Sequence, residues 1–176
     1  MRYLDSYEKK LMKTFNLSAL KFIFIAYALM CTWSNLTHNL IMSISITIDD
    51  FLGIDLSFIY SYAEMIETSD ILMLIATAPF VETLIFQSLI QNIFRKITKS
   101  VLLSVCITAI LFSLVHLGNN VANAVNALGL GITFAMTYEY FRMKRGHFIA
   151  TVVTIALHAF WNLTCVYSLF PFKIFI

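Results

Sequence analysis

The chain has 176 residues, of which 60% are hydrophobic and 12% are charged, and its mean hydropathy is +0.82. These values exclude an ordinary water-soluble domain. The net charge of +2 is too small to indicate binding of nucleic acid, so the basic residues are interpreted as determinants of orientation in a membrane. The apolar residues gather in runs of about 20, the length that a membrane-spanning helix needs.

The N-terminal part combines a charged segment with an unusually long apolar stretch. Residues 1–16 are predicted to form an amphipathic segment in the cytoplasm. An uncleaved first span is expected over 17–35, but apolar sequence continues to residue 48, which is too long for one straight crossing. Tilt, a break or an interfacial segment would absorb the excess. Trp33 and His38 are interpreted as anchors at the membrane interface.

Four further spans are predicted, over residues 71–94, 100–117, 121–141 and 148–170. The connection 49–70 holds six acidic residues and no Lys or Arg, whereas basic clusters at 95–99 and 142–145 follow the second and fourth spans. Five crossings from a cytoplasmic N-terminus place these basic clusters on the cytoplasmic side, as the positive-inside rule requires.

The expected fold is therefore an all-α, polytopic membrane helix bundle. It has about five transmembrane helices, or six if the first apolar stretch divides, and an N-terminal amphipathic segment. No internal repeat is evident, so residues 1–176 are treated as one integral membrane domain, in which 70–170 form a catalytic-like core of four helices.

Three ionisable residues remain well inside the predicted spans: Glu82, His116 and His158. Placing an ionisable group at mid-membrane costs about 2.5 to 3.5 kcal/mol, so such groups usually face the bundle interior and have a function. The alternative to a function is a purely structural role, in which these residues form hydrogen bonds between helices. Such bonds contribute only about 0.6 kcal/mol to stability on average. Glu139 and His147 lie at span ends, where they are expected to reach water.

Asn162 follows His158 by four residues and so shares its helical face. Glu82, His116, His158 and Asn162 are expected to converge from three spans. His116 lies close to the end of its span, so that span must tilt or continue toward Asn120 to bring the imidazole to the depth of Glu82.

These residue types suit hydrolysis by an activated water. A carboxylate in a largely dry pocket can act as a general base toward water, while an imidazole exchanges protons and a carboxamide stabilises an oxyanion. The sequence contains no GxSxG, HExxH or GxGD motif, so no Ser, HExxH-type or paired-Asp mechanism is indicated. Zn²⁺ held by His116 and His158 with Glu82 remains an alternative, as does a site without metal.

Three ordered motifs resemble those of the CPBP intramembrane proteases, which include the CAAX prenyl endopeptidases and the bacterial Abi proteins. The stretch APFVETLIFQ at 78–87 is similar to the family's A-P-x-x-E-E-x-x-F-R, and Phe112-x-x-x-His116 and His158-x-x-x-Asn162 match its other two motifs. The resemblance implies that Glu82 activates water and that His116, His158 and Asn162 are its catalytic partners, with Phe86 and Phe112 as supporting positions.

The first motif departs from the family pattern at two supporting positions. Thr83 stands where the family commonly has a second Glu, and Gln87 stands where it commonly has Arg. The two positions are one helical turn apart, so the exchange removes an acid and a base together and keeps the local charge balanced. This favours a variant site over a decayed one, which would more often retain one unpaired buried charge.

The predicted function is that of an intramembrane endopeptidase in the bacterial cytoplasmic membrane. Its expected partners are the lipid bilayer and a peptide or small membrane-protein substrate, with a role in peptide maturation or bacteriocin self-immunity. One alternative is a non-catalytic immunity or regulatory membrane protein with the same fold. Another is a proton or ion transporter, against which the absence of inverted repeats argues.

Overall fold

The computed structural model describes residues 17–53 and 68–167, and within these ranges every regular element is helical. The elements in chain order are α2 (Ala19–Leu52), α4 (Thr68–Leu72), η1 (Met73–Thr77), α5 (Ala78–Glu82), η2 (Thr83–Gln91), α6 (Asn92–Thr98), α7 (Val101–His116), α8 (Val121–Arg145) and α9 (His147–Val166). The predicted all-α bundle is confirmed. The predicted N-terminal amphipathic segment and the end of the fifth span, 168–170, lie outside the described residues.

Four helical segments are long and apolar enough to cross a membrane: α2, the continuous run from Asp70 to Thr98, α8 and α9. Helix α7 is apolar but has only 16 residues. At about 1.5 Å per residue it extends roughly 24 Å, less than a hydrocarbon core of about 30 Å. These helices agree with the prediction of about five spans.

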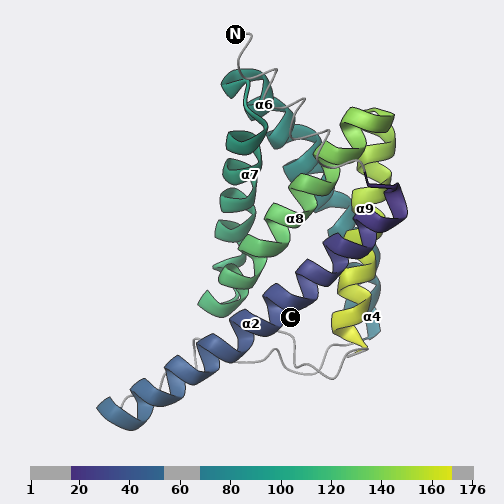
Figure 1. Cartoon of the computed structure of the whole chain (residues 1–176). Coiled ribbons are helices and arrows are strands. Elements are labelled where there is room, and N and C mark those ends of the chain that lie inside the picture. The colour runs from purple at the N-terminus through teal and green to yellow at the C-terminus, as the bar shows by residue number, and fades with distance from the viewer. Residues whose placement is uncertain (1–16, 54–67, 168–176) are drawn as a thin grey trace.

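The first apolar stretch forms one unbroken helix, α2, of 34 residues. The alternative of six spans, which required this stretch to divide, is therefore wrong. The stretch contains no Pro or Gly that would interrupt the helix before Gly53. Figure 1 shows α2, in purple and blue, lying alongside α8 and slanting in nearly the same direction. Only its first half buries side chains of the main apolar core, among them Phe22, Ala26 and Met30.

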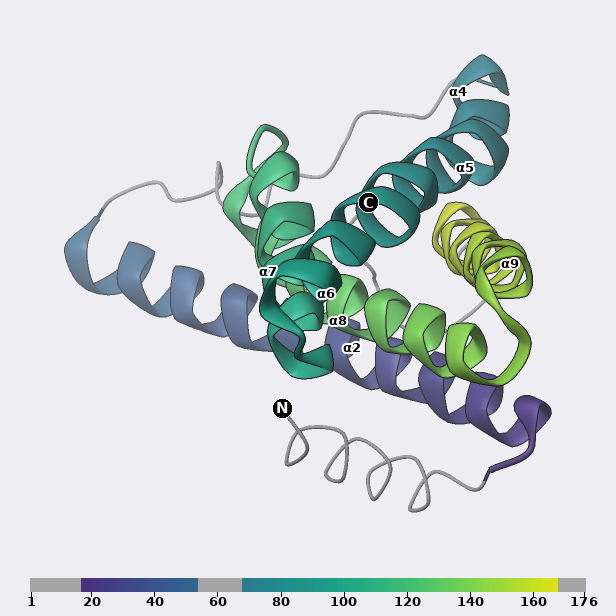
Figure 2. The same cartoon turned by 90° about the horizontal axis from the view of Figure 1, so that it is seen from above.

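Helix α8 lies at the centre of the bundle, between α2, α7 and α9 (Figure 2). Two glycines allow its neighbours to approach closely. Gly131 faces α7, where an added Cβ would lie 3.1 Å from the Cα of Ala109, and Gly129 lies directly against the indole of Trp33 in α2. The Trp33 Nε1–H donates to the carbonyl oxygen of Asn126 at 3.1 Å. Small residues at such crossings are typical of membrane helix packing.

Trp33 and His38, which the sequence suggests as interfacial anchors, also pack within the bundle. Trp33 packs between helices, and His38 is only 9% exposed. Their position near the predicted end of a span carried no information on this contact, because α2 continues well beyond them.

Gly129→Ala is expected to lower the free energy of unfolding by about 1 to 3 kcal/mol, since the new methyl group would overlap the rigid Trp33 ring. Thermal unfolding of the purified protein in detergent micelles measures the change. Gly118→Ala is the control, because its Cβ would meet only the carbonyl oxygen of Val115, at 3.8 Å. Equal stability of the two variants would contradict the close α2–α8 contact.

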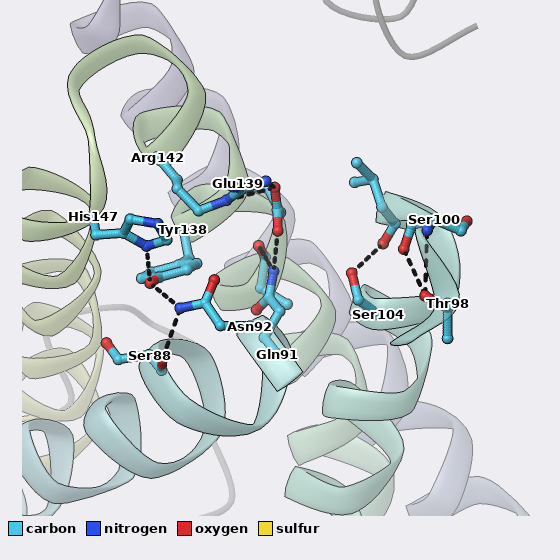
Figure 3. Close-up of polar contacts among 12 residues, drawn as sticks. Ser88, Gln91, Asn92, Thr98, Ser100, Ser104, Tyr138, Glu139, Arg142 and His147 are labelled. Carbon is cyan, nitrogen blue, oxygen red and sulfur yellow. Dashed lines mark hydrogen bonds and ion pairs between the residues drawn. The ribbon is translucent and has the colours of Figure 1, made fainter. Parts of the chain in front are cut away.

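A hydrogen-bonded network joins η2 and α6 to α8 and α9 at the end of the bundle that carries the basic clusters (Figure 3). Asn92 Nδ2 donates to Tyr138 Oη at 2.8 Å, which leaves the Tyr138 hydroxyl able to donate to His147 Nδ1 at 3.1 Å. Gln91 Nε2 donates to the carbonyl oxygen of Ala135 at 3.0 Å.

Glu139 belongs to the same network and corrects a prediction. It was expected to reach water, but its side chain is 1% exposed and accepts hydrogen bonds from Arg142 Nε at 3.0 Å and Gln91 Nε2 at 3.3 Å. Burial is tolerated because Arg142, one turn away, supplies the opposite charge.

Candidate active site

Glu82 is the last residue of α5, at the junction with the π-helical segment η2. π-helical turns are rare and often occur at functional sites, because they redirect side chains and free backbone groups. The side chain of Glu82 remains 28% exposed and lines a pocket of about 170 Å³ beside the end of α7, the start of α8 and the last turns of α9.

The preceding segment η1 presents a backbone carbonyl to the same region. The Ala78 N–H donates to Met73 O, five residues back. In the same π-helical pattern, the donor for the next carbonyl, Leu74 O, would be the backbone N–H of residue 79, which is Pro79. Proline has no N–H. Asn162 Nδ2 of α9 donates to Leu74 O instead, at 2.8 Å. Asn162 therefore fixes α9 against η1 and also lines the pocket.

His158 is held rigidly within the site. Its ring stacks on Phe134 with a centroid distance of 4.3 Å and meets the edge of Phe112 at 6.0 Å. Its Nε2 lies 3.7 Å from Glu82 Oε2, which is too long for a hydrogen bond but close enough for a substrate atom or water to contact both groups. The imidazole is therefore oriented by packing and directed at the carboxylate.

His116 is oriented by its own backbone. Its Nδ1 lies 2.7 Å from the carbonyl oxygen of Phe112, and because a carbonyl can only accept, Nδ1 carries the proton and Nε2 has a free lone pair. Helix α7 ends at His116, so the predicted continuation toward Asn120 is wrong. The helix instead stops at the depth of the pocket, which His116 and Asn119 line together with Glu82.

The four residues singled out in the sequence come together around this one pocket: Glu82, His116, His158 and Asn162. The supporting phenylalanines lie behind them. Phe112 is a pocket residue, and Phe86 packs edge-on against it at a centroid distance of 5.2 Å. The FxxxH motif thus supplies both the imidazole and the ring that flanks His158.

Asparagines that the sequence analysis did not single out also line the pocket: Asn119, Asn123 and Asn126. Asn123 and Asn126 are 8% and 2% exposed. Their spacing of three residues at the start of an otherwise apolar span places them on one helical face, and this was the signal that could have revealed them.

Thr83 and Gln87 are both buried, but the structure does not pair them. Among the described residues, neither Thr83 Oγ1 nor either amide atom of Gln87 has a hydrogen-bond partner. Both lie in η2, which is π-helical. The expectation that positions 83 and 87 are neighbours assumed an α-helical turn, and a π-helical turn spaces side chains differently.

The described residues do not fit a three-ligand zinc site. Within residues 17–53 and 68–167, no three His, Cys, Asp or Glu side chains lie close enough to hold a metal ion. Catalytic zinc sites use three protein ligands and keep one position open. Glu82 and His158 approach each other, but His116 does not complete the set.

A family model described as type II CAAX prenyl endopeptidase Rce1-like matches residues 65–164. No curated protein and no solved structure compared with the chain matches it. The matched region contains all three motifs and the four residues Glu82, His116, His158 and Asn162.

Proposed function

The chain belongs to the type II CAAX prenyl endopeptidase Rce1-like family, a family of proteases, and on this premise we propose that it hydrolyses a peptide bond by means of Glu82 and a water molecule. The observation that carries the proposal is the separation of 3.7 Å between Glu82 Oε2 and His158 Nε2 across a pocket in the bundle. A carboxylate and an imidazole so placed lie side by side and can both contact one water molecule or one reacting group.

The proposed reaction follows from these positions. Glu82 removes a proton from water, and the resulting hydroxide attacks the carbon of the peptide carbonyl. The carbonyl oxygen then becomes an oxyanion. An N–H of His158 Nε2 and the free N–H of Asn162 stabilise that oxyanion. Glu82 then passes the proton to the departing amine as the C–N bond breaks. His116, through the lone pair on Nε2, holds the water.

The proposed substrate is a peptide or small membrane-associated protein of a bacterial cell, in peptide maturation or bacteriocin self-immunity. The described structure supports entry from the end of α7, because that helix stops at His116 and leaves the pocket bordered by the short turn at 117–120. The basic clusters 95–99 and 142–145 lie at the opposite end, which we assign to the cytoplasm together with the N-terminus.

The experiment that tests this function compares peptide termini, by mass spectrometry, in membranes and medium of cells that express either the wild type or Glu82→Gln at equal levels. New termini that appear only with the wild type would establish proteolysis and identify the substrate. Identical profiles from two folded, equally expressed proteins would contradict it.

A non-catalytic immunity or regulatory protein with the same fold is the second candidate. The observation that favours it is the pair Thr83 and Gln87, whose buried polar atoms lack partners among the described residues. A protein of this kind would keep its effect on cells when Glu82 is changed to Gln, which distinguishes it from the protease.

Asn162→Ala is expected to lower the free energy of unfolding by about 1 kcal/mol, because Leu74 O would lose its donor in a partly buried position. Combining it with Pro79→Ala tests whether the loss of this donor causes the effect. The alanine that replaces the proline would supply a backbone N–H to the same carbonyl. The cost of Asn162→Ala should then be smaller in the Pro79→Ala background, as measured by a double-mutant cycle. Equal costs in both backgrounds would rule out this role.

Metal chelation is expected to leave proteolysis within about twofold of the untreated rate, because the described site does not gather three metal ligands. The measurement is the cleavage rate of purified protein after dialysis against EDTA, with a known zinc protease treated in parallel. If activity is lost after dialysis and added Zn²⁺ restores it, the site binds zinc.

A further inference from the structure

A row of asparagines lines the candidate active site on the side of α8, and the reaction described above leaves it without a role. Asn119 lies in the turn before α8, and Asn123 and Asn126 follow in the first turns of that helix. The last two are almost completely buried, although α8 is apolar enough to cross a membrane. Polar side chains within such helices commonly mark the path of a substrate.

The fold itself does not account for these carboxamides. The residue that caps α8 is Asn120, whose Oδ1 accepts a hydrogen bond from the Asn123 N–H at 2.7 Å. Asn126 Oδ1 is buried and, among the residues that the structure describes, has no hydrogen-bond partner. A buried acceptor without a partner lowers stability, so its presence calls for a reason outside the fold.

The backbone that carries these side chains is held against two neighbouring helices. Trp33 Nε1 of α2 donates to the carbonyl oxygen of Asn126 at 3.1 Å, and Ser113 Oγ of α7 donates to that of Ala124 at 2.7 Å. Because no described residue binds Asn126 Oδ1, the carboxamide can rotate and present either its oxygen or its N–H groups to the pocket. A wall whose backbone is already fixed loses little conformational entropy when it binds a ligand.

Hydrolysis at this site places a demand on the substrate. A helical peptide keeps its carbonyl groups in hydrogen bonds within the chain, so the segment that reaches Glu82 must be unwound. Its freed N–H and C=O groups then need new partners, because unsatisfied backbone groups are costly inside a bilayer. A carboxamide has the same kinds of donor and acceptor as a peptide group and can pair with it.

We propose that Asn123 and Asn126 bind the backbone of an extended substrate segment beside the scissile bond, with Asn126 Oδ1 accepting a hydrogen bond from a peptide N–H. This inference rests on the proposed proteolysis and adds the kind of substrate, which is a segment recognised through its main chain. A carboxamide carries no charge, so it selects neither acidic nor basic side chains at the positions that it contacts.

The test measures binding of a fluorescent peptide to the full-length Glu82→Gln protein in detergent micelles. The peptide is a hexapeptide of alternating Ala and Leu, which is too short to form a stable helix. In a series of analogues each amide in turn is replaced by an ester, which removes one N–H donor and keeps the shape. At one or two positions the ester is expected to weaken binding about fivefold, the effect of one neutral hydrogen bond.

Esters enter micelles more readily than amides, so partition into the micelle would change the apparent affinity in the opposite direction. Equal affinities across the whole series would overturn the proposal. Absence of saturable binding would overturn it as well, because recognition through the main chain does not require a particular sequence.

Asn126→Leu, introduced into the Glu82→Gln protein, identifies the group that receives the N–H. It is expected to bind the all-amide peptide about fivefold more weakly, and to bind the sensitive ester as well as the amide, because the partner of that N–H is already gone. Asn39→Leu is the matched control, since Asn39 is exposed on α2 and does not line the pocket. Its affinity should stay within about twofold, and an ester effect that persists in Asn126→Leu would overturn the proposal.

Two checks exclude effects on folding and on access. Because Asn126 Oδ1 has no described partner, Asn126→Leu should unfold at the same temperature as its parent or at a higher one. A marked decrease would assign the carboxamide to the fold and overturn the proposal. Asn126→Ala enlarges the pocket and should weaken binding by a similar factor, whereas unchanged binding would show that the leucine only blocks access and would also overturn it.

Cleavage of the same hexapeptide is followed separately, in protein that retains Glu82. Asn126→Leu is expected to raise KM about fivefold with little change in kcat. An ester effect on binding without any cleavage would contradict proteolysis and support recognition of the main chain. Cleavage with the same KM in Asn126→Leu and wild type would support proteolysis and overturn recognition by Asn126.

Discussion

Glu82→Gln is expected to lower the rate of peptide hydrolysis by about a thousandfold while leaving the fold intact. Glutamine has nearly the same shape but cannot accept a proton from water, and general-base catalysis typically contributes about 10² to 10⁴ in rate. The neighbouring His158 is held by Phe134 and Phe112, so its position does not depend on the charge of Glu82. The measurement is single-turnover cleavage of the identified substrate by purified protein.

The control for this variant is Asp70→Asn, which neutralises an exposed carboxylate on the same continuous helix. It should cleave at the wild-type rate, because Asp70 does not line the pocket. Substrate binding by the Glu82→Gln protein should persist. Cleavage by Glu82→Gln at a rate similar to that of the control would remove Glu82 from the proposed mechanism.

Arg142→Gln is expected to lower the free energy of unfolding by about 3 kcal/mol, the second large effect. Glu139 is 1% exposed, and without Arg142 its negative charge would remain buried with only the Gln91 amide nearby. Removing one partner of a buried ion pair typically costs about 3 to 5 kcal/mol, and the partial exposure of Arg142 favours the lower value. Equilibrium unfolding in micelles provides the measurement.

Two matched variants show whether the loss of stability comes from the buried, unpaired carboxylate of Glu139. Arg142→Gln combined with Glu139→Gln should recover most of the lost stability, because both charges are then removed. Arg145→Gln removes an exposed charge of the same helix and should change stability by less than about 0.5 kcal/mol. A double variant no more stable than Arg142→Gln would exclude the ion pair as the source.

The sequence by itself determined the helical architecture and selected four of the residues that line the candidate site. Apolar runs of about 20 residues can be satisfied in a bilayer only as helices, because every backbone group must find its partner within the segment. Ionisable residues within such runs are expensive unless they face one another, which is why Glu82, His116 and His158 could be selected without a structure. The spacing of His158 and Asn162 placed them on one face.

Helix ends and interhelical contacts depended on tertiary structure. The sequence could not show that α7 stops at His116, because Leu117 continues its apolar pattern, nor that α2 runs unbroken past residue 48. The packing of Trp33 could not be predicted for a related reason: its partner is Gly129, distant in sequence, and hydropathy does not report which residues meet.

The details of the site were also decided by packing. The π-helical segments η1 and η2 changed which side chains are neighbours, so Thr83 and Gln87 do not pair, whereas Asn162 binds the carbonyl that Pro79 leaves without a donor. Glu139 is buried because Arg142 and Gln91 satisfy it across two helices. Sequence periodicity describes a single helix, but hydrogen bonds and burial depend on which helices pack together, and only the folded chain determines that.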